Sequence, residues 1–245
     1  MIDHLKTNKP ACDFVEWADY LQQYLVGKKA VFADNGFPII PASCFLEFLP
    51  DGHDMLPHEK GWFAKENKSK TVLCGFEDDP SIYKHVRNLV NAVIKGGEWL
   101  ERVLGFYRQF YAVCGFDLSV CRNAPLEEQE MFLLLNQLLN AVLAVNGIPL
   151  VANFRMGSEE TLQPMATTYP KDVAYAVGSL GCCDQFYTIG EVLLKSRLLA
   201  FWPRQLLIYG SFSPYYRRIL DEENIPYRHF IDYRSRTYKK SKEVC

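Results

Sequence analysis

Long apolar runs are missing from this sequence. No uncharged stretch approaches the roughly 18 residues that a membrane-spanning helix needs. The first residues, MIDHLKTNKPACDF, contain no apolar segment of the kind that a secretory signal carries. We therefore expect a cytoplasmic protein with no membrane association. A large charge of one sign is missing too: the formal net charge is −2, so the chain as a whole has no strong field that would attract nucleic acid.

Several catalytic and metal-binding signatures are also absent. The eight cysteines form no C-x-x-C pair and the five histidines form no H-E-x-x-H, so a zinc site has little support. No G-x-G-x-x-G follows an apolar run, so the dinucleotide-binding fingerprint is missing. Cys74 and Cys114 lie within apolar runs and are predicted to be buried. The adjacent Cys182 and Cys183 are interpreted either as reactive thiols or as ordinary loop residues.

The chain does contain a regular alternation of short apolar runs and longer helical patterns. Of its 245 residues, 49% are hydrophobic, which is enough for a sizeable core. Strands are predicted at residues 29–33, 71–76, 111–116, 148–154, 173–177, 205–209 and 227–231, with an eighth near residues 37–48. Helices are predicted at residues 12–25, 81–94, 97–110, 126–145, 185–199 and 214–223.

This alternation favours a mainly parallel sheet with helical crossovers. The strand count and the chain length predict an α/β fold with a single (β/α) barrel-like domain, a distorted TIM barrel. An open doubly wound parallel sheet is the alternative. The predicted domain spans residues 1–226, with an irregular insertion at residues 36–67. Residues 227–245 supply the last strand and a basic C-terminal tail.

Polar residues follow most of the predicted strands. Ligands bind at the carboxyl ends of parallel strands, so we expect these residues to meet at one mouth of the barrel. Asp78 and Asp117 are the candidates for acid–base catalysis, or for holding Mg²⁺ or Mn²⁺, which prefer oxygen ligands. The candidate ligand-binding residues, chosen for phosphate recognition, are Ser119, Asn153, Arg155, Ser179, Tyr209 and Ser211.

The same residue types also cap helices, and capping is the competing interpretation at each position taken alone. Asp117 is the strongest candidate, because the next predicted helix begins about nine residues later and needs no cap from it. Asp78 lies in the run Glu77-Asp78-Asp79. Three adjacent acids are tolerated beside a cation or in open solvent, so this run is a second candidate for a functional position.

The C-terminus differs from the rest of the chain in charge. Residues 227–245 carry a net charge of +4, and the remainder carries −6. Tyrosines are interleaved with the cations, a pattern that suits a phosphate backbone and stacked bases. The candidate nucleic-acid contacts are Arg234, Arg236, Lys239 and Lys240, and a solvated tail is the alternative.

A set of motifs between residues 71 and 211 follows the order and spacing of a known family. They are Gly75-Phe76-Glu77-Asp78-Asp79, Phe116-Asp117-Leu118-Ser119 with Ala124-Pro125, Asn146-Gly147-Ile148-Pro149-Leu150-Val151-Ala152-Asn153, Val177-Gly178-Ser179-Leu180-Gly181 and Leu207-Ile208-Tyr209-Gly210-Ser211. On these motifs the chain resembles a prokaryotic and phage family catalogued as a domain of unknown function. The family often has tryptophan where Arg155 stands. The resemblance implies a phage- or plasmid-type setting, in a bacterial or phage-infected cell, and no particular reaction.

Two functions from different classes fit these observations. The first is a barrel that binds a phosphate-containing ligand, either a nucleotide or nucleic acid, with divalent-metal assistance through Asp78 and Asp117. The second is a non-catalytic mobile-element protein that binds and regulates a host or defence protein. Its contact would be residues 36–67, where exposed-looking aromatic residues are typical interface anchors: Phe45, Phe48, Trp62 and Phe63.

Overall fold

Strands that are consecutive in this chain lie next to one another in space. The computed structural model describes residues 12–63, 67–178 and 187–237. Seven strands form one sheet in the order β3-β4-β5-β6-β7-β8-β9, and every neighbouring pair is parallel. Their bounds are β3 Asp54–Pro57, β4 Thr71–Gly75, β5 Ala112–Phe116, β6 Leu150–Asn153, β7 Ala174–Gly178, β8 Gln205–Tyr209 and β9 Tyr227–Phe230.

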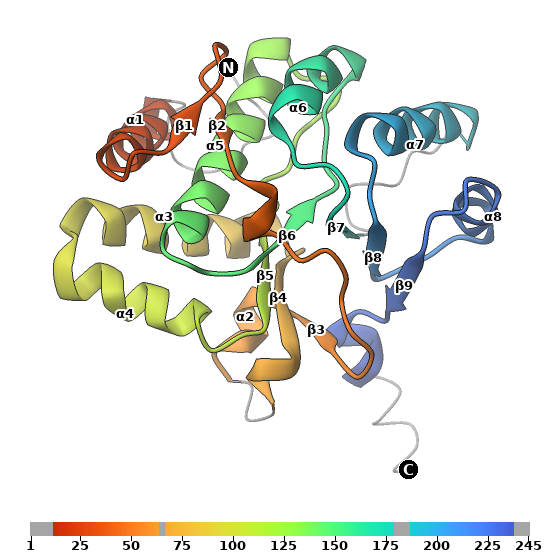
Figure 1. Cartoon of the computed structure of the whole chain (residues 1–245), viewed down its shortest axis with the longest axis horizontal. Coiled ribbons are helices and arrows are strands. Elements are labelled where there is room, and N and C mark those ends of the chain that lie inside the picture. Colours follow the sequence, from red (N-terminus) through yellow and green to blue (C-terminus); the bar gives the residue numbers. More distant parts are fainter. Residues whose placement is uncertain (1–11, 64–66, 179–186, 238–245) are drawn as a thin grey trace.

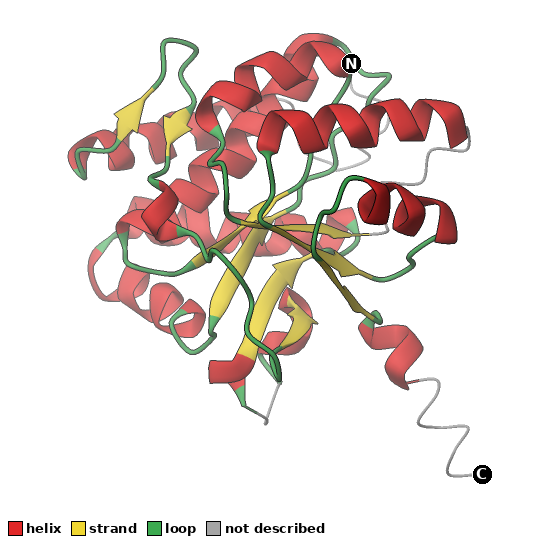
Figure 2. Cartoon of the chain, turned by 45° about the vertical axis from the view of Figure 1, so that its right-hand side comes forward, coloured by secondary structure: helices red, strands yellow, loops and turns green. Residues whose placement is uncertain are grey.

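The helices surround this sheet, as Figures 1 and 2 show. The longer ones are α1 Cys12–Gly27, α3 Asp79–Lys95, α4 Gly97–Tyr107, α5 Leu126–Val145, α7 Tyr187–Phe201 and α8 Pro214–Glu222; the shorter ones are α2 His58–Gly61 and α6 Leu162–Thr168. Right-handed crossovers that always step to the next strand keep the helices on one face and curl the sheet around its other face. The predicted α/β barrel-like fold is confirmed, as a nearly closed barrel of seven strands.

Alternate residues of each strand belong to two different cores. Side chains on the outer face pack against the helices in the larger core, which includes Leu73 of β4 and Tyr175 of β7. The inner face forms a smaller cluster rich in small side chains: Val72, Cys74, Ala112, Cys114, Val151, Ala174, Ala176 and Leu207. Small residues fit because the interior of a narrow barrel is filled by side chains. The predicted burial of Cys74 and Cys114 is confirmed.

The barrel is not closed by hydrogen bonds between strands: β3 and β9 are the two edges of the sheet. Arginine side chains join them instead. The guanidinium of Arg228 on β9 donates to the carbonyl oxygens of Pro50 and His53, at 2.8 and 2.6 Å. Arg236, just past β9, donates to Asp54 Oδ2 at 2.6 Å and to the carbonyl of Met55 at 2.9 Å. We call this junction the seam.

The structure corrects the prediction for the first strand. Residues 29–33 do not enter the barrel; Val31–Phe32 (β1) pairs with Pro38–Ile39 (β2) in a separate antiparallel hairpin. The edge strand of the barrel is β3, which lies inside the segment predicted to be irregular. Residues 45–49 of that segment cross the amino-terminal end of the barrel. There the backbone of Leu46 bonds to Leu150 and Ala174, and the backbone N–H of Leu49 donates to Gln205 Oε1 at 2.9 Å.

An irregularity at the carboxyl end of β4 sets up the opposite end of the barrel. The pairing of β4 with β5 shifts register between Cys74 and Gly75. A side chain at Gly75 would have its Cβ 2.6 Å from the carbonyl oxygen of Gly115, so only glycine allows this approach. Bulges of this kind redirect the residues that follow. Phe76 consequently belongs to the inner cluster, and its ring lies 2.7 Å from where a Cβ on Gly178 of β7 would be.

A search for membrane-spanning helices among the described residues finds none of sufficient length and apolarity.

Candidate functional site

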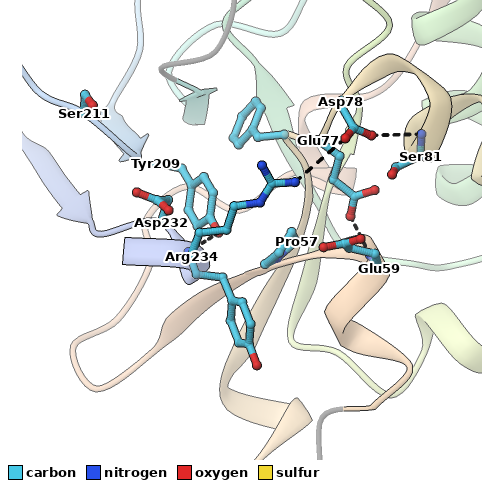
Figure 3. A pocket seen from close by; sticks show the side chains of 11 residues that line it. Pro57, Glu59, Glu77, Asp78, Ser81, Tyr209, Ser211, Asp232 and Arg234 are labelled. Carbon is cyan, nitrogen blue, oxygen red and sulfur yellow. Dashed lines mark hydrogen bonds and ion pairs between the residues drawn. The ribbon is translucent and has the colours of Figure 1, made fainter. Parts of the chain in front are cut away.

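A cavity of about 260 Å³ lies at the carboxyl ends of β3, β4, β8 and β9. It is the place where ligands bind in parallel α/β barrels. We call it the mouth cavity, and Figure 3 shows the side chains around it. It is lined by Pro57, Glu59, Phe76, Glu77, Asp78, Ser81, Tyr209, Ser211, Asp232, Tyr233 and Arg234.

Glu77 is the buried acid of the mouth cavity. The redirected chain after Gly75 places its side chain at 4% exposure, toward α2 and α3. Its Oε1 accepts a hydrogen bond from the backbone N–H of Glu59 at 2.5 Å. Its Oε2 has no hydrogen-bond partner among the described residues, and His85 Nε2 lies 3.4 Å away. A buried carboxylate with one incompletely bonded oxygen can take a proton or a hydrogen bond from a ligand.

Three aromatic side chains stand behind Glu77. The rings of His58 and His85 lie 3.8 Å apart, and His58 Nε2 is hydrogen-bonded to the hydroxyl of Tyr107 at 2.8 Å. Burial, and secondly the charge of His85, hold the pKa of His58 well below its usual 6.5. His58 is therefore neutral at physiological pH. Two imidazole side chains, His58 on α2 and His85 on α3, therefore lie behind the Glu77 carboxylate.

Asp78, which is exposed, and Asp232, which is partly buried, each cap a helical segment beside the cavity. Asp78 Oδ1 accepts from the backbone N–H of Ser81 at 3.1 Å at the start of α3, and hydrogen bonding to Ser81 lowers its pKa. Partial burial raises the pKa of Asp232, but hydrogen bonds from Ser235 and nearby backbone outweigh it, so that pKa is lowered too. Both side chains are negatively charged at neutral pH.

Arg234 lies across the cavity from Asp78. Residues 233–237 form a helical turn after β9, and we call residues 231–237 the C-terminal strap. From the strap, Arg234 reaches toward Asp78, and their charged groups are 3.8 Å apart (Figure 3). The strap is held by Tyr209, whose hydroxyl accepts the backbone N–H of Tyr233 at 2.9 Å. The strap after β9 therefore faces residues that follow β3 and β4 across the cavity.

Asp117 lies in a different environment, buried under the helices at 4% exposure. Arg155 forks onto it, with Nε 2.8 Å from Oδ1 and Nη2 2.5 Å from Oδ2. Asn153 Nδ2 also donates to Asp117 Oδ1 at 2.9 Å. The structure therefore brings three predicted site residues together as one buried ion-pair network. None of them lines the mouth cavity, which takes Asp78, Tyr209 and Ser211 of the predicted set.

The remaining predicted residues are spread over the molecule. Ser119 is exposed and donates to Asp79 Oδ1 at 2.7 Å, which ties the β5–α5 loop to α3. Of the predicted nucleic-acid contacts, Arg236 holds the seam and Arg234 borders the mouth cavity. Ser179, Lys239 and Lys240 lie outside the described residues, as do Cys182 and Cys183.

The predicted Mg²⁺ or Mn²⁺ site gains no geometric support from this arrangement. Within residues 12–63, 67–178 and 187–237, no group of three or more His, Cys, Asp or Glu side chains is placed to hold a metal ion. Asp117 is bonded to Arg155, and Asp78 is more than half exposed. The divalent-metal site predicted at Asp78 and Asp117 therefore stays a prediction.

Sequence reasoning missed several residues of the mouth cavity: Glu59, Phe76, Glu77, Ser81 and Tyr233 as ligand contacts. Glu77 follows a predicted strand and Asp232 follows β9, but the sequence predicts neither β3 nor the strap beside them. The exposed-looking aromatics of residues 36–67 divide in the structure. Phe45 is buried at 7%, which corrects its prediction, whereas Phe48, Trp62 and Phe63 are exposed at 47, 50 and 82%.

The fold and the cavity together define the class: an α/β barrel-like protein with a cavity at the carboxyl ends of its strands. A scan against protein-family models, and searches of curated proteins and of solved structures, find no significant match to this chain. The resemblance to a prokaryotic and phage family of unknown function therefore stays a prediction.

Proposed function

We propose that the protein binds a small polar ligand in the mouth cavity, with the Glu77 carboxylate at its buried wall. The observation that carries this proposal is the buried, incompletely bonded Glu77 carboxylate at the wall of a 260 Å³ cavity. Perturbed or unsatisfied titratable groups in a concave site are the usual mark of a ligand or active site.

The location agrees with the expectation for strand tips, since Asp78, Tyr209 and Ser211 all line the cavity. The structure adds a condition to the prediction that the ligand contains phosphate. A nucleotide or nucleic-acid phosphate at this site would face four carboxylates, those of Glu59, Glu77, Asp78 and Asp232. Two cations lie beside them: Arg234, and Lys60, whose Nζ is 2.9 Å from Glu59 Oε1. Phosphate binding here therefore depends on a divalent cation placed between the phosphate and the acids. A cytoplasmic setting stays part of the proposal.

A cavity-filling variant tests the location. Ser211→Phe places a ring at the exposed edge of the cavity, and Ser69→Phe is the matched change at another exposed serine. Wild type and both variants are compared by thermal shift with nucleotides, with and without Mg²⁺, and with sugars and amines. We expect at least one ligand class to raise the unfolding midpoint of wild type and Ser69→Phe but not of Ser211→Phe. A flat panel, or equal shifts in all three proteins, overturns the proposal.

A second function, binding of a host or defence protein, is favoured by one specific observation. Trp62 and Phe63 are adjacent and exposed at the end of α2, although Trp62 also stacks on Phe106 at 3.9 Å. Exposed aromatic pairs are typical interface anchors. Phe63→Ser would abolish capture of a partner from bacterial lysate and leave small-ligand binding intact. Unchanged capture by this variant excludes Phe63 as the anchor.

A further inference from the structure

The charge and the walls of the mouth cavity indicate one class of ligand. We infer that the cavity takes a small organic cation, a molecule that carries an ammonium or guanidinium group. This inference rests on the proposed function, because it names the ligand of the same site.

The first argument is the charge of the lining. Four carboxylates and one guanidinium, Arg234, line the cavity with a formal charge of −3. Lys60 lies beside the lining, with Nζ 2.9 Å from Glu59 Oε1, and reduces this charge to −2. Two of the acids, Asp78 and Asp232, have lowered pKa values and stay ionised at neutral pH. A cleft lined by charges of one sign concentrates ions of the opposite sign. The lining therefore attracts cations and repels free phosphates and carboxylates.

The second argument is independent of the acid count and concerns one atom. Glu77 Oε2 belongs to a side chain that is 4% exposed; His85 Nε2 lies 3.4 Å from it, but no described residue donates a hydrogen bond to it. A buried acceptor left without a donor is destabilising, so a donor on the ligand would be bound there. A sugar hydroxyl could donate that hydrogen bond, but it would leave the negative charge of the lining in place. An ammonium or guanidinium group supplies both the donor and the charge.

The third argument comes from cations that the chain already places here. The Arg234 guanidinium lies 3.8 Å from Asp78 and is 81% exposed, so it is weakly held. Lys60 Nζ lies 5.5 Å from the centre of the Tyr233 ring, within the range of a cation–π contact. The guanidinium of Arg234 shows that the acids of the cavity accept this chemical group, and a ligand can displace it easily.

The aromatic side chains that line the cavity also suit an organic cation. Phe76 and Tyr209 form the inner wall with their rings 6.1 Å apart and inclined by 27°, and Tyr233 borders the cavity from the strap. Aromatic faces attract cations and also pack against the methylene groups of an alkylamine. A ligand with a charged end and a short apolar stem therefore satisfies both the acids and the rings.

The test is calorimetric titration of the full chain with agmatine, which carries one ammonium and one guanidinium group. AMP with and without Mg²⁺ is the anionic comparison, and glucose is the neutral one. We expect agmatine to bind, and Glu77→Gln to weaken it about tenfold or more, because a charge-assisted hydrogen bond is lost. The amide of the Glu77→Gln variant would still present an oxygen to the N–H of Glu59, so the fold is expected to persist.

Further variants keep the test independent of Glu77. Asp78→Asn removes a charge but preserves the helix cap, and we expect it to weaken agmatine binding severalfold. Arg234→Gln removes the competing cation and is expected to strengthen binding up to about fivefold. Glu222→Gln, on the exposed face of α8, makes the same charge change elsewhere and should have no effect.

The outcomes separate the two proposals. If AMP or glucose binds at a site blocked by Ser211→Phe and agmatine does not, the cation inference is overturned and the mouth cavity remains a ligand site. If agmatine binds equally well to Glu77→Gln, Asp78→Asn and Glu222→Gln, its binding is unspecific and the inference falls. If no probe binds, the proposed function falls with it.

Discussion

Two acids at strand ends of the barrel, Asp117 and Glu77, are equally buried and lie in different surroundings. Asp117 is buried with both of its carboxylate oxygens occupied by Arg155 and Asn153. Glu77 is equally buried but keeps one oxygen without a hydrogen bond from the described residues, at the wall of a cavity. The difference teaches that an acid at the end of a strand is available to a ligand only when the neighbouring strands leave its hydrogen bonds unfilled.

The largest expected effect comes from breaking the ion-pair network of Asp117, Arg155 and Asn153, which we call the closed cluster. Arg155→Met leaves Asp117 buried without its charge partner, so we expect a loss of about 3–5 kcal/mol in the free energy of unfolding. Urea denaturation measures it. The double variant Asp117→Asn, Arg155→Met removes both charges and should recover part of the loss. A loss below about 1 kcal/mol for the single variant would show that the pair is solvated in solution.

A pH titration probes the layer behind Glu77. The pKa of His58 is lowered in the folded protein, so the unfolded chain binds a proton there more readily. The stability contributed by neutral His58 is complete above pH 6.5 and is lost as the pH falls below that value. The slope reaches at most about 1.4 kcal/mol per pH unit. We expect His58→Phe to flatten the stability curve between about pH 6.5 and 5; an unchanged slope would assign it to other groups.

We call the acids around Glu77 at the mouth cavity the open cluster. We expect substitutions there to cost less stability than substitutions in the closed cluster. Asp78→Ala removes the cap of α3 and should cost about 1 kcal/mol, whereas Asp78→Asn keeps an acceptor for Ser81 and should cost only a few tenths. Thermal or urea denaturation of the two variants distinguishes capping from charge. Equal losses in both would mean that the charge of Asp78, rather than its hydrogen bond, stabilises the fold.

The smallest effect is expected at Arg234. Its guanidinium is 81% exposed and 3.8 Å from Asp78, so Arg234→Gln should change stability by less than about 0.5 kcal/mol. The same substitution is expected to alter ligand affinity, as described above. A large loss of stability would instead show that the contact between Arg234 and Asp78 helps to hold the strap in place. The open cluster would then contain a stabilising ion pair, as the closed cluster does.

Much of this fold could be predicted from local pattern. The long helix Leu126–Val145 and the strand Gln205–Tyr209 have the predicted bounds, because apolar periodicity and clear stop signals define both. The first strand was wrong although a signal was available. Asn35-Gly36 is a strong hairpin turn, and it pairs residues 31–32 with residues 38–39. The edge strand Asp54–Pro57 gave no such signal, because its four residues, Asp-Met-Leu-Pro, do not alternate between polar and apolar side chains and end in a proline.

The site was predictable only in outline. Strand ends indicated Asp78, Tyr209 and Ser211, and these three residues line one cavity in the structure. Whether a residue at a strand end faces a cavity or a buried partner depends on register, and here on the one-residue shift at Gly75. No local pattern indicates that shift, so the sequence could not distinguish the closed Asp117 cluster from the open Glu77 cluster. The strap's part in the cavity depended on the long-range contact between Tyr209 and Tyr233.

The seam also determines where the native barrel can open locally. Strands β4 to β8 are each joined to two neighbours by backbone ladders, but β9 has such a ladder only with β8. On its other side two arginine side chains hold it, through contacts to Pro50, His53, Asp54 and Met55. A strand with a backbone ladder on one side only opens locally more easily than a strand with two ladders. Amide hydrogens of β9 should therefore exchange with solvent before those of β4 and β5. The strap would leave with it, and the mouth cavity would then be open to bulk water without unfolding of the remaining six strands.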